Sequence, residues 1–237
     1  MKKLLILFFL LNLGFIDADA QYKERQATTT YAGLGYALLF FTNPDVSNIY
    51  PTIDLNNSTL LNEVTGFFGL KFSNSFAAEF APSILFARSN RNIDGFYFTQ
   101  NNQRYWYMPQ DASLFAMTLD FKAKYYPFAK NEESILKDVY LSAGGGIMYI
   151  KEQYNNYIFA DSTYNSQFIT SREDNNNAWV PNVVFSFGYM SQNNFGYGFD
   201  IGYRIVPMPI NRNTPLTSSN ASNYNSLNVS LKAMFNF

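Results

Sequence analysis

The sequence predicts an all-β fold, in which eight antiparallel strands follow one another as an up-and-down meander and close into a barrel. Two observations predict it. Large apolar residues alternate with small or charged ones in eight separate segments, which is the pattern of strands with two different faces. The breaks between these segments are alternately long and short. This rhythm is expected when tight turns lie at one end of a sheet and longer connections at the other.

The first four predicted strands cover residues 31–41, 62–72, 76–88 and 115–125. Their bulky faces carry Leu34, Tyr36 and Phe40; Val64 and Phe68; Phe80 and Ile84; and Phe115, Leu119 and Phe121. Small and charged residues fill most of the opposite faces. Residues 73–75, Ser-Asn-Ser, form a tight turn between the second and third strands, because these residues favour turns.

The last four predicted strands cover residues 139–149, 179–190, 194–205 and 227–237. Their bulky faces carry Leu141, Ile147 and Tyr149; Val183, Phe185 and Phe187; Phe195, Tyr197, Phe199 and Ile201; and Leu227, Val229 and Leu231. Residues 127–137 and 191–194 are the other short turns, and the long connections are 42–61, 89–111, 151–178 and 206–223. A hairpin hidden within 151–178 would raise the number of strands to ten.

The volume of the barrel decides which face points inward. Eight strands enclose a lumen that side chains just fill, and the large apolar residues of all the strands could not fit there. The other face therefore points inward, with the charged residues Glu63, Lys71, Glu79, Asp120, Lys122, Lys124, Asp200, Arg204 and Lys232. Because acidic and basic groups nearly balance, we expect a salt-bridged plug. The alternative is that these charges line a pore.

The outward face then needs a surrounding other than water. Aromatic residues make up 19% of the chain and charged residues 15%, a balance that is unusual for a soluble domain. An exposed apolar belt of this size would exceed what soluble monomers tolerate. Strands of about 11 residues tilted by about 45° span about 25 Å, the height of the apolar band of membrane barrels. The predicted fold is therefore a closed transmembrane β-barrel.

The N-terminal residues indicate export. Lys2 and Lys3 precede an apolar run, residues 4–16, and the small-x-small site Ala-Asp-Ala at 18–20. This pattern is typical of a signal peptide, here residues 1–20. A short segment, residues 21–29, would then precede the barrel domain, residues 30–237.

These features resemble the family of small Gram-negative outer-membrane β-barrels, of the OmpA transmembrane-domain, OmpX and OmpW type. The signal peptide, the even number of strands and the sequence LNVSLKAMFNF at the end of the chain carry the resemblance. In that family the barrel assembly machinery reads a terminal aromatic residue with apolar residues at alternate positions before it. The resemblance therefore implies an assembly signal made of Val229, Leu231, Phe235 and Phe237.

The same resemblance implies an outer-membrane location, with residues 21–29 and both termini in the periplasm and the four long connections outside the cell. Tyr125, Tyr126 and Phe128 are then expected in the periplasmic aromatic girdle, and Tyr149 and Trp179 in the outer one.

Composition excludes several kinds of chemistry. The chain has no cysteine and no histidine, so disulfides, thiolate nucleophiles and Cys/His metal sites are absent. A net charge of −1 gives no sign of the excess of basic residues that is typical of proteins that bind nucleic acid. Enzymes of the resembled fold rely on a catalytic histidine, so we expect no enzyme, although acid–base chemistry by Glu63, Glu79, Asp120 or Asp200 is left open. We expect no cofactor and no metal, because the oxygen-rich residues 172–177 lack the spacing of a calcium loop.

The connection 89–111 carries the candidate ligand contacts. Two aromatic triplets, residues 96–98 and 105–107, flank Asn101–Asn102, which predicts a hairpin that rises beyond the membrane. Tyr97, Tyr105, Trp106 and Tyr107 could contact a glycan or a host or phage surface. The alternative is that these aromatic residues pack loop on loop.

We therefore expect a monomeric barrel in outer-membrane lipid, with a filled polar interior and four long extracellular loops, in a structural or surface-interaction role. Two alternatives stay open. One is a narrow porin for small or hydrophobic solutes, and the other is a membrane component of a secretion or envelope-assembly system.

Overall fold

The computed structural model describes residues 29–55, 59–89, 96–130, 134–160, 167–191, 194–209 and 221–237. The strands of the barrel are β1 (Thr29–Phe41), β4 (Asn62–Lys71), β5 (Phe76–Ser89), β7 (Gln103–Tyr125), β8 (Val139–Ala160), β9 (Phe168–Met190), β10 (Phe195–Ile205) and β11 (Ser226–Asn236). The smaller elements are α2 (Pro44–Ser47), β2 (Ile53–Asp54), β3 (Thr59–Leu60), β6 (Phe96–Gln100) and the 3₁₀ turn η1 (Ile135–Asp138).

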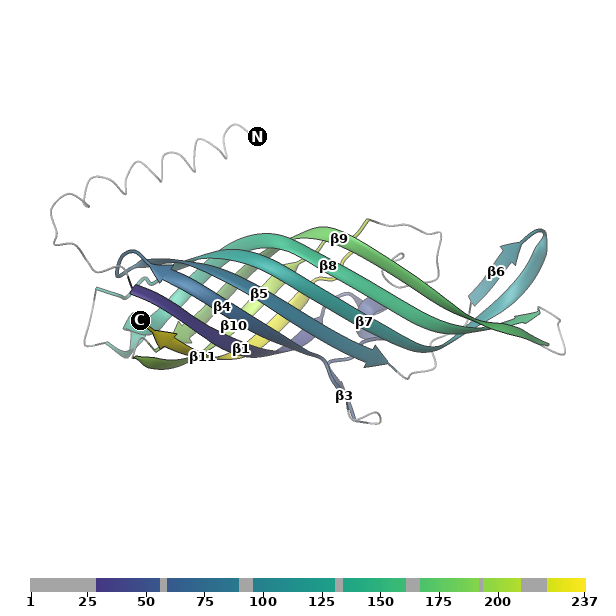
Figure 1. The fold of residues 1–237 in the computed structure, drawn as a ribbon, viewed down its shortest axis with the longest axis horizontal. Coiled ribbons are helices and arrows are strands. Elements are labelled where there is room, and N and C mark those ends of the chain that lie inside the picture. The colour runs from purple at the N-terminus through teal and green to yellow at the C-terminus, as the bar shows by residue number, and fades with distance from the viewer. Residues whose placement is uncertain are drawn as a thin grey trace, which may run out of the picture.

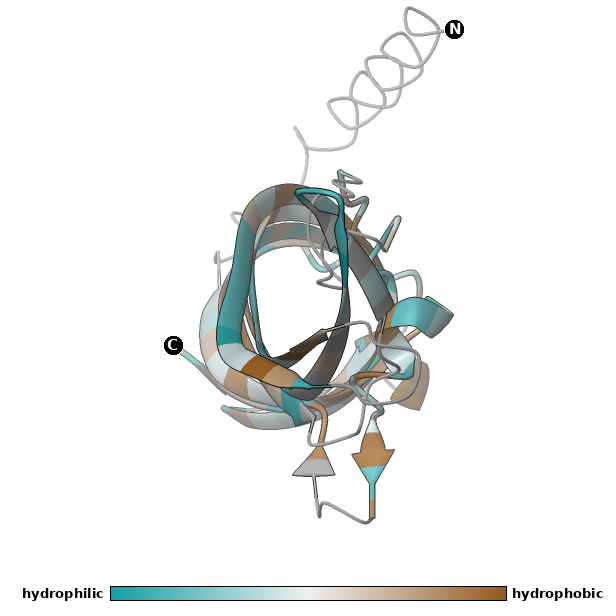
Figure 2. Ribbon diagram, turned by 90° about the vertical axis from the view of Figure 1, so that its right-hand side faces the viewer, coloured by the Kyte–Doolittle hydropathy of each residue, from teal (hydrophilic) through white to brown (hydrophobic). Residues whose placement is uncertain are grey.

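These eight strands form a closed antiparallel ring. Each pairs with its neighbour in the chain, and the ring closes between β1 and β11. Seen along its axis, the sheet is a closed oval (Figure 2). The start of β1 and the C-terminus lie at the same end of the barrel (Figure 1), where the backbone nitrogen of Phe237 donates to the carbonyl of Thr30 at 3.0 Å. The predicted meander of eight strands is confirmed, and the ring does not contain ten.

The predicted inward and outward faces are also confirmed. Along β10, exposed and buried residues alternate at every position. Leu231 and Phe121 on the outward face are 69% and 67% exposed, whereas Arg204 on the inward face is 5% exposed. The exposed aromatic and aliphatic side chains form a belt around the barrel, which we call the belt. A closed ring of hydrogen-bonded strands inside such a belt is the architecture of a membrane-spanning β-barrel.

The connections predicted over 89–111 and 151–178 are largely strand, because the hairpins weighed within them lengthen the sheet and add no strand to the ring. β7, β8 and β9 continue well past the other strands of the ring (Figure 1), through residues expected to be loops. β6 pairs with the start of β7. We call this extension, residues 96–111, 153–160 and 168–175, the arm. β8 has 22 residues, so roughly 35 Å of strand lies beyond the ten or so residues that a membrane requires.

Other expectations need smaller corrections. Tyr126 does not belong to the aromatic girdle, because its side chain is only 3% exposed and points into the barrel, whereas Tyr125 and Phe128 are exposed. The predicted signal peptide and residues 21–28 lie outside the described residues, and Thr29 already belongs to β1. Within the described ranges no helix has the length and apolar character needed to cross a membrane.

The chain has two tryptophans, and each reports on a different surface. Trp106→Phe leaves Trp179 in the belt, and Trp179→Phe leaves Trp106 in the arm. In lipid vesicles we expect brominated acyl chains to quench the fluorescence of Trp179 and aqueous iodide to quench that of Trp106. Strong iodide quenching of Trp179 in the folded protein would place the belt in water and overturn the membrane-spanning fold.

Candidate functional site

Inside the barrel, layers of different character follow one another along the axis. On β7, the inward side chains run from Tyr126 beside its end, through Lys124 and Asp120, to Ala116 and Leu114. The charged positions therefore form an ionic layer between two mainly apolar clusters. We call the cluster at the end of the termini the proximal cluster and the one toward the arm the distal plug.

Arg204 is the centre of the ionic layer. Its Nη1 lies 2.9 Å from Oε1 of Glu63, and its Nη2 lies 3.1 Å from Oδ2 of Asp120. Because these residues come from β10, β4 and β7, one guanidinium connects strands that are not neighbours across the lumen. Asn228 Nδ2 also donates to Glu63 at 3.0 Å. All three charged side chains are at least nine-tenths buried, where a carboxylate without a cation would be costly.

Two further ion pairs join neighbouring strands. Lys124 pairs with Glu79, and Lys232 pairs with Asp200. The hydroxyl of Tyr31 donates to Glu79 at 3.1 Å, and that of Tyr140 donates to Asp200 at 2.9 Å. Aromatic rings thus extend the charged layer into the proximal cluster.

Seven of the nine predicted lumen charges therefore lie in buried ion pairs, namely Glu63, Glu79, Asp120, Lys124, Asp200, Arg204 and Lys232. Lys71 and Lys122 are half-buried on the same inward face, and the Lys71 ammonium lies 5.0 Å from the centre of the Tyr126 ring. The four carboxylates considered for acid–base chemistry are those that pair with cations. Each of these carboxylates is buried beside its cation, so its charge is balanced inside the barrel.

The distal plug was not foreseen. It consists of buried residues from the barrel wall and from two connections, including Leu39, Phe41, Val46, Tyr50, Leu85, Leu114, Ile150, Tyr154, Val206, Met208 and Tyr224. The wall residues occupy inward positions that the sequence pattern reserved for small or polar groups. Since these residues are almost completely buried, the plug occupies the lumen toward the arm.

Two connections are folded into the distal plug. α2 is capped by Asn43, whose side chain accepts from the nitrogen of Asp45 at 3.0 Å, and it places Val46 and Tyr50 in the plug. Asn43 Nδ2 donates to the carbonyl of Asn223 at 3.0 Å, so the connection after β1 is tied to the one before β11.

We call these two connections, α2 with the residues that follow it and the residues before β11, the lid. Tyrosine hydroxyls of the lid donate hydrogen bonds to the barrel wall. Tyr50 donates to Oε1 of Glu152 at 2.8 Å, and Tyr224 donates to Oε2 at 3.4 Å. Burial, together with the nearby Glu152 carboxylate, raises the pKa of Tyr50 and of Tyr224 well above the ordinary value. Both phenols therefore keep the protons that they donate. No sequence motif marks Glu152 or these tyrosines, because they meet only in the folded chain.

The tip of the arm gathers the predicted aromatic contacts. Asn101 and Asn102 have positive φ angles of 51° and 60°, which confirms the predicted two-residue hairpin turn. The rings of Tyr97 and Trp106 lie 4.6 Å apart, and the Arg104 guanidinium lies 3.6 Å from the centre of the Tyr97 ring. Tyr105 donates to Gln103 at 2.7 Å. Tyr107 lies in β7, and its side chain is outside the described part of the structure.

Residues 172–177, weighed above as a calcium loop, lie in β9. Asp174 pairs there with Arg172 at 2.8 Å and accepts from Asn156 at 2.7 Å. Among the residues that the structure describes, no group of three or more acidic residues is placed to hold a metal ion.

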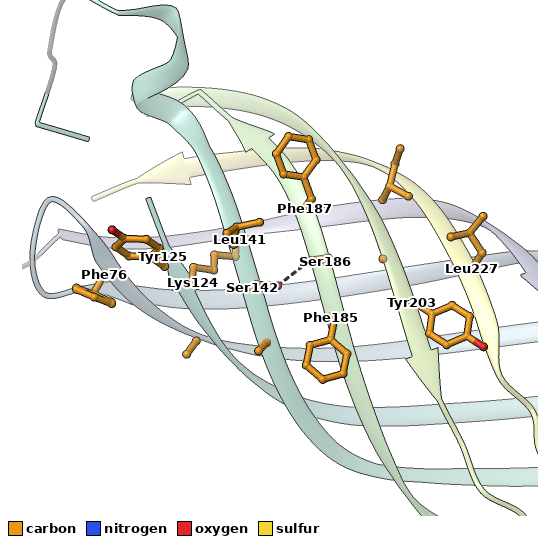
Figure 3. Close-up of a pocket in the computed structure, with 14 residues that line it drawn as sticks. Phe76, Lys124, Tyr125, Leu141, Ser142, Phe185, Ser186, Phe187, Tyr203 and Leu227 are labelled. Carbon is orange, nitrogen blue, oxygen red and sulfur yellow. Dashed lines mark hydrogen bonds between the residues drawn. The ribbon is translucent and has the colours of Figure 1, made fainter. Parts of the chain in front are cut away.

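The belt is hollowed at one place into a shallow apolar groove of about 650 Å³. Phe76, Tyr125, Leu141, Phe185, Phe187 and Tyr203 line it (Figure 3), together with Ala123 and Ala143. The hydroxyls of Ser142 and Ser186, which also line it, are 2.6 Å apart, and Figure 3 marks this hydrogen bond. The groove faces outward among other belt residues, so it is a surface that acyl chains fill.

The residues of the predicted assembly signal share the outward face of β11. Val229, Leu231, Phe235 and Phe237 are between 40% and 70% exposed. Their position in the belt agrees with the predicted pattern of apolar residues at every second position.

Comparisons with known proteins give likeness in shape only. No protein-family model matches the chain, and no curated protein matches it in sequence. Among solved structures, it is similar to Ail, the attachment invasion locus protein of Yersinia pestis, with 12% identity, a TM-score of 0.47, and 89% of this chain and 99% of that one covered.

Two further structures are similar. Neisserial surface protein A has 11% identity and a TM-score of 0.40, over 89% of this chain and 97% of that one. A major outer membrane protein from Thermus thermophilus has 10% identity and a TM-score of 0.45, over 88% and 99%. At these values the likeness assigns no ligand and no activity to this chain, so we base its function on its own residues.

Removing the central cation of the ionic layer tests the site. Arg204→Ala leaves the carboxylates of Glu63 and Asp120 buried without their partner, and we expect the free energy of unfolding to fall by about 3–5 kcal/mol. Arg88→Ala is the matched control. It removes an exposed ion pair with Asp111, and we expect a loss of about 1 kcal/mol or less. Urea titrations in lipid vesicles measure both, and equal losses would contradict the role of the ionic layer.

Proposed function

We propose that this chain is an outer-membrane barrel that conducts no solute and that holds a binding arm above the cell surface. The distal plug is the main support for a barrel that conducts no solute. A pore needs a continuous aqueous path, whereas here buried apolar side chains follow the ionic layer along the same lumen. Filled interiors are also what eight-stranded barrels generally have.

The arm supports a role in surface interaction. Ten or more residues of β7, β8 and β9 extend beyond the membrane span and stay paired there, with one register shift at Pro109/Asp111 and one at Ile158/Phe159. A rigid hairpin at the tip presents Tyr97, Trp106 and Arg104 together. Aromatic rings beside a guanidinium suit ligands with both apolar faces and hydroxyl groups, such as glycans or the surface of another protein.

The proposal includes the route by which the protein reaches the membrane. Residues 1–20 would direct export and be removed, and residues 21–28 would lie in the periplasm before β1. The outward residues of β11 would provide the signal for barrel assembly. These steps would leave the arm outside the cell, because the arm and the C-terminus lie at opposite ends of the barrel (Figure 1).

Single-channel recording tests the closed lumen. The purified protein, inserted into a planar bilayer, is expected to give no stable current steps, because the distal plug and the ionic layer both lie in the path of an ion. A wide, water-filled porin in the same bilayer provides the positive control. Reproducible ion-selective steps from the wild-type protein would favour the narrow-porin alternative.

Substitution at the tip tests the binding role. Cells that display the protein are screened on a glycan array and against host cells, and any ligand found is titrated against Trp106→Ala. We expect binding to weaken by about tenfold or more, because a central aromatic residue often dominates an interface. Tyr157→Ala is the matched control, an exposed aromatic residue of the arm that lies on β8, opposite Met108 and outside the β6–β7 hairpin. Equal binding by all three proteins would remove the arm from the interaction.

A further inference from the structure

The edge of the belt nearest the arm has a distinctive surface where β5, β7 and β8 lie side by side. On the outward face, Phe86 is followed by Arg88 along β5, and Tyr149 is followed by Lys151 along β8. On β7 the outward residues change from Phe115 to Ser113. These three strands thus pass from apolar to polar side chains within one outward position of each other in the sheet, and such a change marks where the hydrocarbon of a membrane ends.

A row of aromatic rings marks this level. The ring centres of Phe86 and Phe115 are 5.0 Å apart, those of Phe115 and Tyr149 are 6.2 Å apart, and those of Tyr149 and Trp179 are 4.9 Å apart. Tyrosine and tryptophan prefer the depth of lipid headgroups. Residues directly above the row therefore meet the headgroups themselves.

A groove of about 460 Å³ opens above this row. Arg88, Ser113, Lys151 and Gln153 line its polar side, and Phe86 and Phe115 line its apolar side. In the sheet, Arg88 lies opposite Ser113, Ser113 lies opposite Gln153, and Phe115 lies opposite Lys151. Two cations therefore border one groove whose other wall consists of rings in the belt.

We propose that this groove binds the phosphate of a membrane lipid. Arginine and lysine are the usual partners of phosphate, and the long stems of both can lie on apolar residues while their charges reach the headgroup. The wall of Phe86 and Phe115 suits the first carbons of an acyl chain. A free anion in water would make no use of that wall, which favours a lipid over soluble phosphate.

Among the described residues, Asp111 is the acidic residue that pairs with Arg88, and it leaves Arg88 accessible. Its Oδ2 lies 3.4 Å from Nη2 of Arg88, and its Oδ1 accepts from Asn155 at 2.8 Å. The Arg88 side chain remains 70% exposed, and a guanidinium has five N–H donors. An exposed pair of this kind contributes little, so a phosphate can share or replace it.

Lipid binding in nanodiscs tests the inference. The full chain is placed in phosphatidylcholine nanodiscs that contain either diphosphorylated lipid A or the same lipid without its phosphates, and retained lipid is measured by native mass spectrometry. We expect the wild-type protein to retain the phosphorylated form preferentially. Arg88→Gln with Lys151→Gln should weaken that retention roughly thirtyfold. Lys130→Gln, an exposed lysine at the opposite end of the barrel, is the control and should have no effect.

Three results would overturn the inference. They are equal retention of both lipids by the wild-type protein, unchanged retention by the double variant, and an equal loss in Lys130→Gln. Binding of inorganic phosphate at millimolar concentration that displaces the lipid would assign the site to a soluble anion instead. Heat-modifiable gel mobility verifies that each variant is folded.

The inference rests on the proposed function only in the choice of leaflet, because the lipid belongs to the outer leaflet if the arm lies outside the cell. Symmetric nanodiscs offer the lipid on both sides. A failed binding test therefore leaves the proposed closed barrel untouched, and a conducting barrel would leave this test unaffected.

Discussion

The requirement that every backbone group in a membrane find its hydrogen-bond partner within the protein governs this structure. The sheet meets it by closing between β1 and β11, and closure creates a lumen as well as a lipid surface. The charges that cannot face lipid must then lie inside, where each needs a partner. Arg204 is the partner of both Glu63 and Asp120. The closed shape of the sheet and the paired charges of its interior therefore both follow from the need to satisfy polar groups within the membrane.

Closure also separates the molecule into parts with different roles. The proximal cluster, the ionic layer and the distal plug fill the barrel and stabilise it. Because the interior is occupied, any recognition would use an outer surface, and in the described part of the chain the arm and the edge of the belt are two such surfaces. The lid formed by α2 and the connection before β11 belongs to the plug, which leaves β6 to β9 as the part that projects furthest (Figure 1).

The alternation of large apolar residues with small or charged ones predicted the ring, its two faces and the seven charged residues that lie in buried ion pairs. The reason is that lipid lies on one side of each strand and a narrow lumen on the other. Above the membrane this lipid is absent. Residues 170–177 of β9 are polar at every position, because the inward face of the arm buries polar side chains such as Asn156 and Asp174 as well as apolar ones, so this part of β9 shows no alternation of apolar and polar residues. The distal plug escaped prediction for another reason. Tyr50, Glu152 and Tyr224 are far apart in the chain and come together only through the closed sheet.

The continuity of β7, β8 and β9 from the barrel into the arm has a mechanical consequence. A ligand held at the tip by a moving cell or particle would pull roughly along these strands. Antiparallel hydrogen bonds lie perpendicular to the strands, so such a load shears many of them together and does not open them one after another. The longest paired regions join β8 to β7 and to β9, and they continue into the membrane, where the barrel acts as the anchor. Under such a load the arm would resist extension along its strands.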